Sequence, residues 1–250
     1  MIARLNAGNT KAMVRQSQPT ILLTRPLAQS LRFADQVGGA VISPLMLPEF
    51  LDPALPETDF AAVILTSETG VQAARRISAT GAVLPDLAYC VGNRTTQAAR
   101  AAGFQALSAE GDASALLALI KARHTSGRLL LLRPEDTAGD LTKDLNSVGI
   151  ETVSVIVYRQ KPQSLTAEAI ALLQGDTPVI LPVFSPRSAR LLVAEIRRIN
   201  GHAPLWLAAL SPAVAQAFDL PAELIQIAAQ PDASAMLDAV TAMQQRGIGS

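Results

Sequence analysis

The same series of short motifs occurs twice along this chain, in the same order. The separation between partners grows only from 108 residues at the arginines to 118 at the serines and 120 at the aspartates. Small loop insertions account for that growth, so the chain contains two similar units, and a cleft between such units is where ligand sites prefer to lie. The paired motifs are Leu23-Thr24-Arg25-Pro26 with Leu131-Leu132-Arg133-Pro134, Ala62-Val63-Ile64-Leu65-Thr66-Ser67 with Val179-Ile180-Leu181-Pro182-Val183-Phe184-Ser185, and Asp112-Ala113-Ser114 with Asp232-Ala233-Ser234.

Short apolar runs alternate with helical patterns through both halves. The runs are apolar throughout, which is typical of parallel strands covered on both faces, and the alternation predicts a doubly wound α/β fold. The predicted strands are 21–24, 40–43, 61–66, 88–91, 104–107, 128–132, 152–158, 179–184, 205–210 and 224–228. The predicted helices are 26–37, 69–79, 94–102, 114–121, 136–148, 166–174, 187–199, 213–218 and 234–245. Ser114 and Ser234 are the predicted N-caps of their helices.

Two segments interrupt this rhythm. Residues 44–50 are extended, apolar and bounded by prolines, and residues 155–162 follow at the same place in the second unit, 110 to 111 residues later. Equivalent extended segments that leave the same place in each unit predict a paired, two-stranded connection between the units.

Composition excludes several classes of protein. The 49% of apolar residues supply material for two cores. The 21 basic and 21 acidic residues cancel, and without a basic run the sequence does not indicate a nucleic-acid binder. No apolar run approaches the roughly 20 residues that a membrane-spanning helix needs, so no membrane contact is expected.

The cysteine and histidine content narrows the chemistry. Cys90 is the only cysteine, which rules out an intrachain disulfide and fits a reducing cytoplasm. Its apolar strand predicts a core thiol rather than a nucleophile. His124 and His202 are the only histidines, so a metal site would need carboxylates almost alone, and no metal is expected. Residues 1–18 lack an apolar run and are predicted to be a disordered leader, not a secretory signal.

The turns after the predicted strands are rich in hydroxyls, arginines and helix N-termini. Ligands of open α/β sheets bind at the carboxyl ends of the strands, and this set suits a polyanion. Any single serine or threonine in such a turn also fits a plain N-cap. No glycine-rich dinucleotide motif or P-loop is present in the sequence. The turns are Thr24-Arg25-Pro26, Thr66-Ser67-Glu68-Thr69-Gly70, Gly92-Asn93-Arg94-Thr95-Thr96, Arg133-Pro134-Glu135, Ser185-Pro186-Arg187-Ser188 and Ser211-Pro212.

Five motifs stand in a characteristic order across most of residues 20–242. They are Thr66-Ser67-Glu68-Thr69-Gly70-Val71, Val91-Gly92-Asn93-Arg94-Thr95-Thr96, Val157-Tyr158, Phe184-Ser185-Pro186-Arg187-Ser188-Ala189 and Pro231-Asp232-Ala233-Ser234-Ala235-Met236-Leu237. Each motif is short, but their order and spacing resemble the successive motifs of the uroporphyrinogen-III synthase family.

The resemblance implies two similar flavodoxin-like α/β domains with parallel sheets, joined by a two-stranded linker. One domain would combine residues 19–43 with 163–250 and the other would be 50–154, with 44–49 and 155–162 as the inter-domain strands. The implied reaction closes hydroxymethylbilane to uroporphyrinogen III, with inversion of ring D and loss of water, and needs no cofactor. The implied protein is a cytoplasmic monomer that makes transient contact with the preceding pathway enzyme.

The implied chemistry relies on the substrate. Loss of hydroxide from its terminal hydroxymethyl carbon gives an azafulvene cation, which the pyrrole stabilises. The enzyme assists that departure and holds the eight carboxylates so that attack falls on the substituted ring-D position, through a spiro intermediate. Such control is mainly positioning, with modest acid help.

The match to the family's motifs implies that Tyr158 is the proton donor. It also implies that the residues lining the substrate cleft are Thr66, Ser67, Thr95, Ser185 and Ser188. Strand-end position adds Thr24, Arg25, Arg133 and Arg187 to the substrate-binding set. From spacing alone, Tyr158 also fits a linker tyrosine that packs its ring and turns its hydroxyl to water. This chain departs from the family pattern Ile-Gly-x-x-Thr-Ala at two positions. Ser211 replaces the glycine, and Val214 replaces the threonine.

Two other functions compete with this one. A non-catalytic two-domain receptor or sensor for a small polyanion would present a similar cleft but leave hydroxymethylbilane unconverted. A response-regulator-like unit would need a phosphorylatable aspartate at a strand end, where this sequence has threonine, serine and arginine.

Overall fold

The computed structural model describes residues 19–137 and 139–248 of the chain. The chain divides into two compact units: unit 1 takes the chain up to Met46 and from Pro162 onward, and unit 2 is Leu47–Lys161. The predicted leader, residues 1–18, lies outside the described residues. The predicted domain limits, 19–43 with 163–250 and 50–154, stay a prediction.

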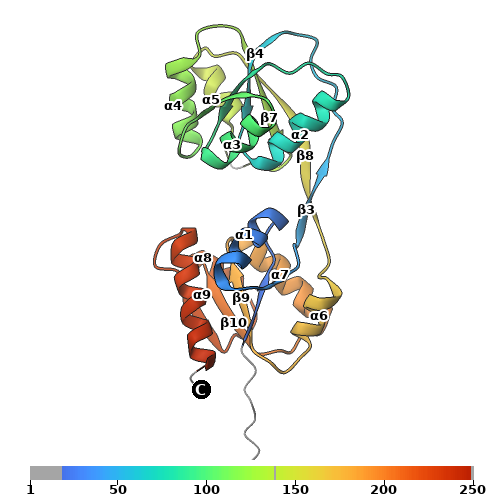
Figure 1. Cartoon of the computed structure of the whole chain (residues 1–250), viewed down its shortest axis with the longest axis vertical. Coiled ribbons are helices and arrows are strands. Elements are labelled where there is room, and N and C mark those ends of the chain that lie inside the picture. Colours follow the sequence, from blue (N-terminus) through green and yellow to red (C-terminus); the bar gives the residue numbers. More distant parts are fainter. Residues whose placement is uncertain (1–18, 138, 249–250) are drawn as a thin grey trace, which may run out of the picture. The chain divides into compact units, whose positions relative to one another are not determined.

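Unit 1 is built on a five-stranded sheet of order β11-β10-β9-β1-β2, with parallel pairing between neighbours. Its strands are β1 (Thr20–Leu23), β2 (Val41–Ile42), β9 (Val179–Val183), β10 (Leu205–Ala209) and β11 (Leu224–Ile227). Its helices are α1 (Leu27–Val37), α6 (Ala167–Leu173), α7 (Pro186–Arg198), α8 (Pro212–Ala217) and α9 (Ala233–Ile248), and they cover both faces of the sheet (Figure 1).

Unit 2 carries a six-stranded sheet of order β3-β8-β7-β4-β5-β6. Its strands are β3 (Met46–Phe50), β4 (Phe60–Leu65), β5 (Leu87–Cys90), β6 (Gln105–Ser108), β7 (Arg128–Pro134) and β8 (Thr152–Pro162). Its helices are α2 (Glu68–Ala79), α3 (Asn93–Ala101), α4 (Ala113–Arg123) and α5 (Leu141–Ser147). The strands from β4 to β8 pair in parallel. The predicted α/β fold class with parallel sheets is therefore confirmed.

The two extended segments pair as the sequence predicts. β3 and β8 are hydrogen-bonded neighbours, and Leu51 N–H donates to the Val157 carbonyl at 3.0 Å. Gln163 N–H donates to the Leu45 carbonyl at 2.9 Å, so residue numbers fall along one segment as they rise along the other. The chain thus passes between the units along two antiparallel strands.

Both sheets follow one plan, circularly permuted. In chain order, unit 1 has the flavodoxin arrangement 2-1-3-4-5, whereas the strands of unit 2 from β4 to β8 have the arrangement 3-2-1-4-5. The sequence repeat pairs β7 with β1, β4 with β9, β5 with β10 and β6 with β11, and these partners hold the same positions in their sheets. The difference arises because the chain enters unit 1 at the strand equivalent to β7.

Each sheet is buried on both faces. Along β4, Val63 and Leu65 pack with residues of α2 and α3, while Ala62 and Ile64 pack with residues of α4 and α5. Unit 1 repeats this division, with α6, α7 and α8 on one face and α1 and α9 on the other. Side chains alternate between faces along a strand, so a strand buried on both faces must be apolar throughout. That requirement explains the predicted runs.

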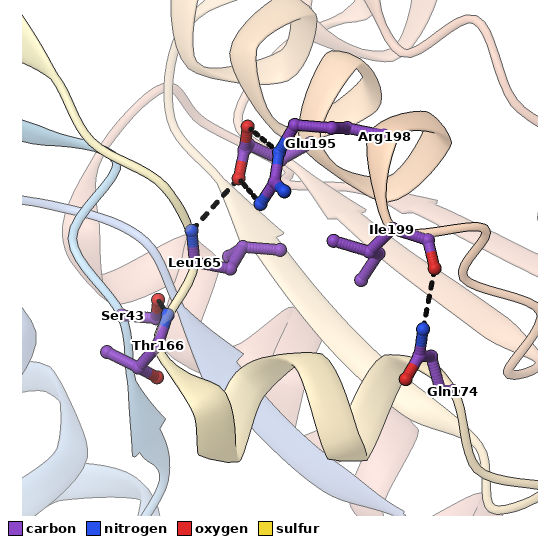
Figure 2. Close-up of polar contacts among 7 residues, drawn as sticks. All are labelled: Ser43, Leu165, Thr166, Gln174, Glu195, Arg198 and Ile199. Atoms are coloured by element: carbon purple, nitrogen blue, oxygen red, sulfur yellow. Dashed lines mark hydrogen bonds and ion pairs between the residues drawn. The ribbon is translucent and has the colours of Figure 1, made fainter.

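A carboxylate anchors the chain where it enters α6 (Figure 2). The Glu195 carboxylate on α7 accepts a hydrogen bond from the Leu165 N–H at 2.9 Å. It accepts two more from Nε and Nη2 of Arg198, at 2.8 and 2.7 Å. Beside it, the Thr166 N–H donates to the Ser43 hydroxyl at 2.9 Å. The Glu195 bond attaches the segment after the linker to α7, whose N-cap is Ser185 and whose first turn carries Ser188. The Thr166 bond attaches the same segment to the residue that follows β2.

We expect Glu195→Ala to lower the free energy of unfolding by about 1–3 kcal/mol, because the Leu165 N–H is left buried without an acceptor. Glu195→Gln keeps an acceptor and should lose less. The Arg198 fork lowers the pKa of Glu195 below 4.5 against the opposing effect of burial. The stability that the ionised Glu195 carboxylate contributes is therefore fully present above pH 4.5 and is lost as the pH falls through the lowered pKa. Urea unfolding of the three proteins at pH 7 and pH 3.5 measures this; equal losses at both pH values would contradict it.

Candidate active site

A cavity of about 670 Å³ opens in unit 2 at the carboxyl ends of β4 and β7 and beside Ser154 and Tyr158 of β8. We call it the strand-end cavity. Its walls bring together four of the predicted site residues, which are Thr66, Ser67, Arg133 and Tyr158. Sequence position alone placed these residues at three separate strand ends, and the parallel sheet joins them in one cavity.

Ser67 lies where β4 passes into α2. Its backbone is extended, with φ −157° and ψ 157°, and its hydroxyl oxygen accepts the Gly70 N–H at 3.0 Å. This is the N-cap geometry in which a serine satisfies one of the unpaired N–H groups of the first helical turn. The cap holds the hydroxyl at the cavity wall.

Tyr158 reaches the cavity because β8 contains a bulge. Arg133 pairs with Ile156, but Pro134 pairs with Tyr158, so Val157 is an extra residue in the ladder. A bulge re-aims the side chain that follows it. The Tyr158 phenol oxygen lies 3.0 Å from the Ser67 hydroxyl, and either atom can be the donor.

The Tyr158 phenol is nearly enclosed. The side chain is 4% exposed, and its ring lies 6.4 Å from that of Phe50. Burial raises the pKa of Tyr158 above 10, and the hydrogen bond to Ser67 opposes part of that rise. The phenol therefore keeps its proton throughout the neutral range, so it can serve as a proton donor there. The alternative of a hydroxyl turned to water does not fit this hydrogen bond.

The Arg133 guanidinium makes hydrogen bonds to the backbone of the turn that follows β7. Its Nη1 donates to the carbonyls of Pro134 and Glu135 at 3.0 and 3.2 Å, and its Nε lies 3.5 Å from the Ser154 hydroxyl. The guanidinium thus shapes the turn that forms one cavity wall. Its role in binding substrate stays a prediction.

The cavity also includes polar residues that the sequence analysis missed. They come from the turn after β7, from α5 and from β8, and they include Asp136, Asp140, Lys143, Asn146 and Ser154. The helix predicted from residue 136 begins at Leu141, because Asp140 accepts the Lys143 N–H at 3.0 Å as the N-cap. The available signal was Asp140 itself, a preferred N-cap residue that stands directly before the apolar Leu141. It would have started the helix at Leu141 and left Asp136 and Asp140 outside it.

Thr95, the remaining predicted residue of unit 2, and Val214 are buried, whereas Ser211 is partly exposed. Thr95, on the first turn of α3, is 5% exposed and does not line the strand-end cavity. The repeat pairs Thr95 with Val214, which is 1% exposed on α8. Gly92 and Ser211, the N-caps before them, have φ of −157° in both cases, which any residue adopts. The departures at Ser211 and Val214 therefore require no change of fold.

The predicted residues of unit 1 lie at the ends of the neighbouring strands β1 and β9. Thr24 is 6% exposed, and the Arg25 guanidinium lies 3.6 Å above the centre of the Phe184 ring. Ser185 caps α7 by accepting the Ser188 N–H at 3.1 Å, and the exposed Arg187 lies on the same first turn. These residues belong to a different unit from Tyr158. That the two groups serve one substrate stays a prediction.

Neither Cys90 nor a metal cluster offers other chemistry in the described part of the chain. Cys90 is fully buried in β5, and burial raises the pKa of its thiol to about 11, as expected of a core thiol. Among residues 19–137 and 139–248, no group of three His, Cys, Asp or Glu side chains is arranged to hold a metal ion. In the same residues, no helix has the length and apolar character needed to span a membrane.

The fold and the cavity define a class: a permuted pair of parallel α/β units with a protonated, hydrogen-bonded tyrosine at the strand ends. Residues 31–238 match the model of the uroporphyrinogen-III synthase HemD family. That match covers most of the chain, so the chain belongs to the uroporphyrinogen-III synthase family. It is an enzyme that closes hydroxymethylbilane to uroporphyrinogen III with inversion of ring D and loss of water, and the receptor alternative is not favoured.

One solved structure shares this fold. The chain is similar to uroporphyrinogen-III synthetase from Helicobacter pylori, with a TM-score of 0.60 at 17% identity, over 90% of this chain and 99% of that one. It also matches a mutant uroporphyrinogen III synthase from Thermus thermophilus, with a TM-score of 0.49 at 15% identity, over 91% and 99%. A search of curated proteins gave no match.

Proposed function

We propose that the strand-end cavity of unit 2 is where the hydroxymethyl end of hydroxymethylbilane reacts, with Tyr158 as the proton donor. The hydrogen bond between Tyr158 and Ser67 carries the proposal, because it fixes a buried, protonated phenol at the wall of a cavity. A donor must lie within hydrogen-bond reach of the oxygen that it protonates.

The reaction needs one proton early and returns one late. Tyr158 Oη donates its proton to the departing hydroxyl as the carbon–oxygen bond breaks, which releases water and leaves an azafulvene cation. The substituted ring-D carbon attacks that cation, and the spiro intermediate fragments and recloses. The proton that a pyrrole carbon loses on rearomatisation neutralises the phenolate, so no oxidant or reductant is consumed.

Binding of the substrate carboxylates calls for several modest contacts. Thr66 at the end of β4 contributes a hydroxyl, and Lys143 on α5 adds a cation whose ammonium has no partner among the described residues. Thr95 and Arg133 in unit 2, and Thr24, Arg25, Ser185, Arg187 and Ser188 in unit 1, complete the proposed binding set. A charge-assisted hydrogen bond contributes roughly 1.5–3 kcal/mol when shielded, and less where water competes.

We expect Lys143→Met to raise the KM for hydroxymethylbilane by about three- to tenfold, with kcat within twofold of wild type, because the ammonium attracts a carboxylate without touching the reacting carbon. The matched control is Lys121→Met, which removes a charge from α4 away from the cavity lining. Steady-state kinetics with enzymatically generated substrate measure both constants. An unchanged KM for Lys143→Met, or an equal rise for the control, would count against a substrate site at this wall.

We further propose that the protein works as a cytoplasmic monomer that needs no cofactor and receives its unstable substrate through transient contact with the preceding pathway enzyme. A single buried thiol suits a reducing compartment. Sedimentation equilibrium across a hundredfold range of concentration tests the monomer, since a mass that rises toward twice 26.3 kDa would exclude it.

A further inference from the structure

We propose that Ser67 is a positioning residue of the reaction, whose hydroxyl proton points at Tyr158 and keeps the phenol proton free for the substrate. This inference rests on the proposed role of Tyr158 as proton donor. It differs from a binding role, because Ser67 would act through Tyr158 and not on a substrate carboxylate.

The hydrogen-bond inventory of Ser67 supports this role. A serine hydroxyl has one proton and two acceptor positions, and the Gly70 N–H takes one acceptor position. The 3.0 Å contact with Tyr158 is then made either with the serine proton or with the phenol proton. Only the first arrangement leaves the phenol proton available for the departing hydroxyl. After the transfer, the same serine proton remains hydrogen-bonded to the phenolate oxygen, where the bond becomes charge-assisted and stronger.

The repeat within the chain supplies a natural comparison. Ser185 caps α7 with nearly the same backbone, φ −155° and ψ 154°, and accepts an N–H three residues on at 3.1 Å. There the third residue is Ser188, whose hydroxyl lies 2.8 Å from the Ser185 hydroxyl. In unit 2 the equivalent residue is Gly70, which has no hydroxyl to engage Ser67. The glycine thus leaves Ser67 free to bond the phenol, while its N–H still makes the cap.

The space around Gly70 is large enough to replace the serine–glycine pair of unit 2 with the serine–serine pair of unit 1. A Cβ placed on Gly70 would lie 3.5 Å from the Ser67 hydroxyl oxygen and no nearer to any other atom, which is ordinary contact. Gly70→Ser should therefore recreate the serine pair of unit 1 beside Tyr158. Its hydroxyl would compete with the phenol for Ser67. Gly70→Ala adds the same Cβ without the hydroxyl and is the matched control.

The kinetic test is a double-mutant cycle. We expect Ser67→Ala to lower kcat three- to tenfold with KM within twofold, and to lower it no further when Tyr158 is already phenylalanine, because residues that act as a unit are not additive. Gly70→Ser should fall below Gly70→Ala in kcat by threefold or more. Thr166→Ala, which removes the comparable cap of α6 outside the site, should lose similar thermal stability and keep full kcat.

A spectroscopic readout is independent of turnover. The chain has two tyrosines, so Tyr89→Phe leaves Tyr158 as the only phenol. In that background, Ser67→Ala should move the phenolate absorbance titration of Tyr158 to higher pH, because the bond to Ser67 favours the ionised form.

The outcomes separate the two claims. Full activity of Tyr158→Phe would remove the proposed acid and this inference with it. A slow Tyr158→Phe together with a Ser67→Ala that changes only KM, or that slows Tyr158→Phe further, would overturn the inference alone. An unshifted Tyr158 titration in Ser67→Ala would overturn it as well.

Discussion

Replacement of Tyr158 by phenylalanine should lower kcat by on the order of tens-fold while the product remains the type III isomer. A positioned general acid contributes about 100- to 10,000-fold, and the low end applies because azafulvene formation also proceeds unaided in water. Phenylalanine keeps the buried ring and its packing against Phe50, so only the proton and the bond to Ser67 are lost. Ring-D inversion depends on how the substrate is folded, which this change leaves untouched.

The dependence of kcat on pH provides a second test of Tyr158 as the proton donor. The pKa of Tyr158 lies above 10, so wild-type kcat should show no loss from deprotonation of this group between pH 6 and pH 9. It should fall only at higher pH, as the phenol ionises. Stopped assays across this range compare wild type with Tyr158→Phe, with circular dichroism to exclude unfolding. If the variant turns over at the wild-type rate, the acid is water or a substrate carboxylate, and Tyr158 is structural.

The Cys90 thiol should react with Ellman's reagent at least about a hundredfold more slowly in the folded protein than in denaturant. Burial raises its pKa from 9.0 to about 11, and at pH 8 two pH units leave about one hundredth of the thiolate, which is the reactive form. Complete burial of Cys90 adds to this, since reagent reaches the sulfur only when the unit opens.

The comparison uses one thiol per chain and therefore needs no site assignment. Cys90→Ala should release no colour and should keep its activity. A folded protein that reacts at the rate of a small-molecule thiol would show that β5 is not the closed core strand described above. An activity loss in a correctly folded Cys90→Ala protein would identify Cys90 as a functional group.

The fold was accessible from the sequence because parallel strands buried on both faces leave an unusual signature. Apolar runs such as Ala62–Leu65 have no polar position, and helical patterns separate them at regular spacing. The repeat added the pairing of equivalent strands. The circular permutation was not accessible, because the order of strands in a sheet depends on where the chain enters it and not on the residues of any one strand.

The candidate site was partly accessible for a physical reason. Parallel strands bring their carboxyl ends to one edge, so Ser67, Arg133 and Tyr158 were predicted to share a location without knowledge of the contacts. The bulge at Val157 that aims Tyr158 has no glycine or proline to mark it. The hydroxyl of Ser67 was predicted to bind substrate, and its bond to Tyr158 depends on two residues 91 positions apart.

The first residues of the helices were also only partly predictable from the sequence. Ser114 and Ser234 were predicted as N-caps, but Asp112 accepts the N–H groups of Ser114 and Ala115, and Asp232 accepts that of Ala235. In both motifs an aspartate precedes the serine by two residues, and either side chain can cap a helix. The capping residue lies two positions earlier than predicted, and the helices begin at Ala113 and Ala233, because a carboxylate accepts these N–H groups more strongly than a hydroxyl does.

The isomer composition of the product tests the central claim most directly. Hydroxymethylbilane is generated enzymatically in the presence of this protein, the products are oxidised, and the type I and type III uroporphyrins are separated by chromatography. Spontaneous closure gives type I, so the account predicts that type III replaces it as the protein concentration rises, and that Tyr158→Phe yields type III more slowly. Type I product that stays unchanged at high protein concentration would contradict the account.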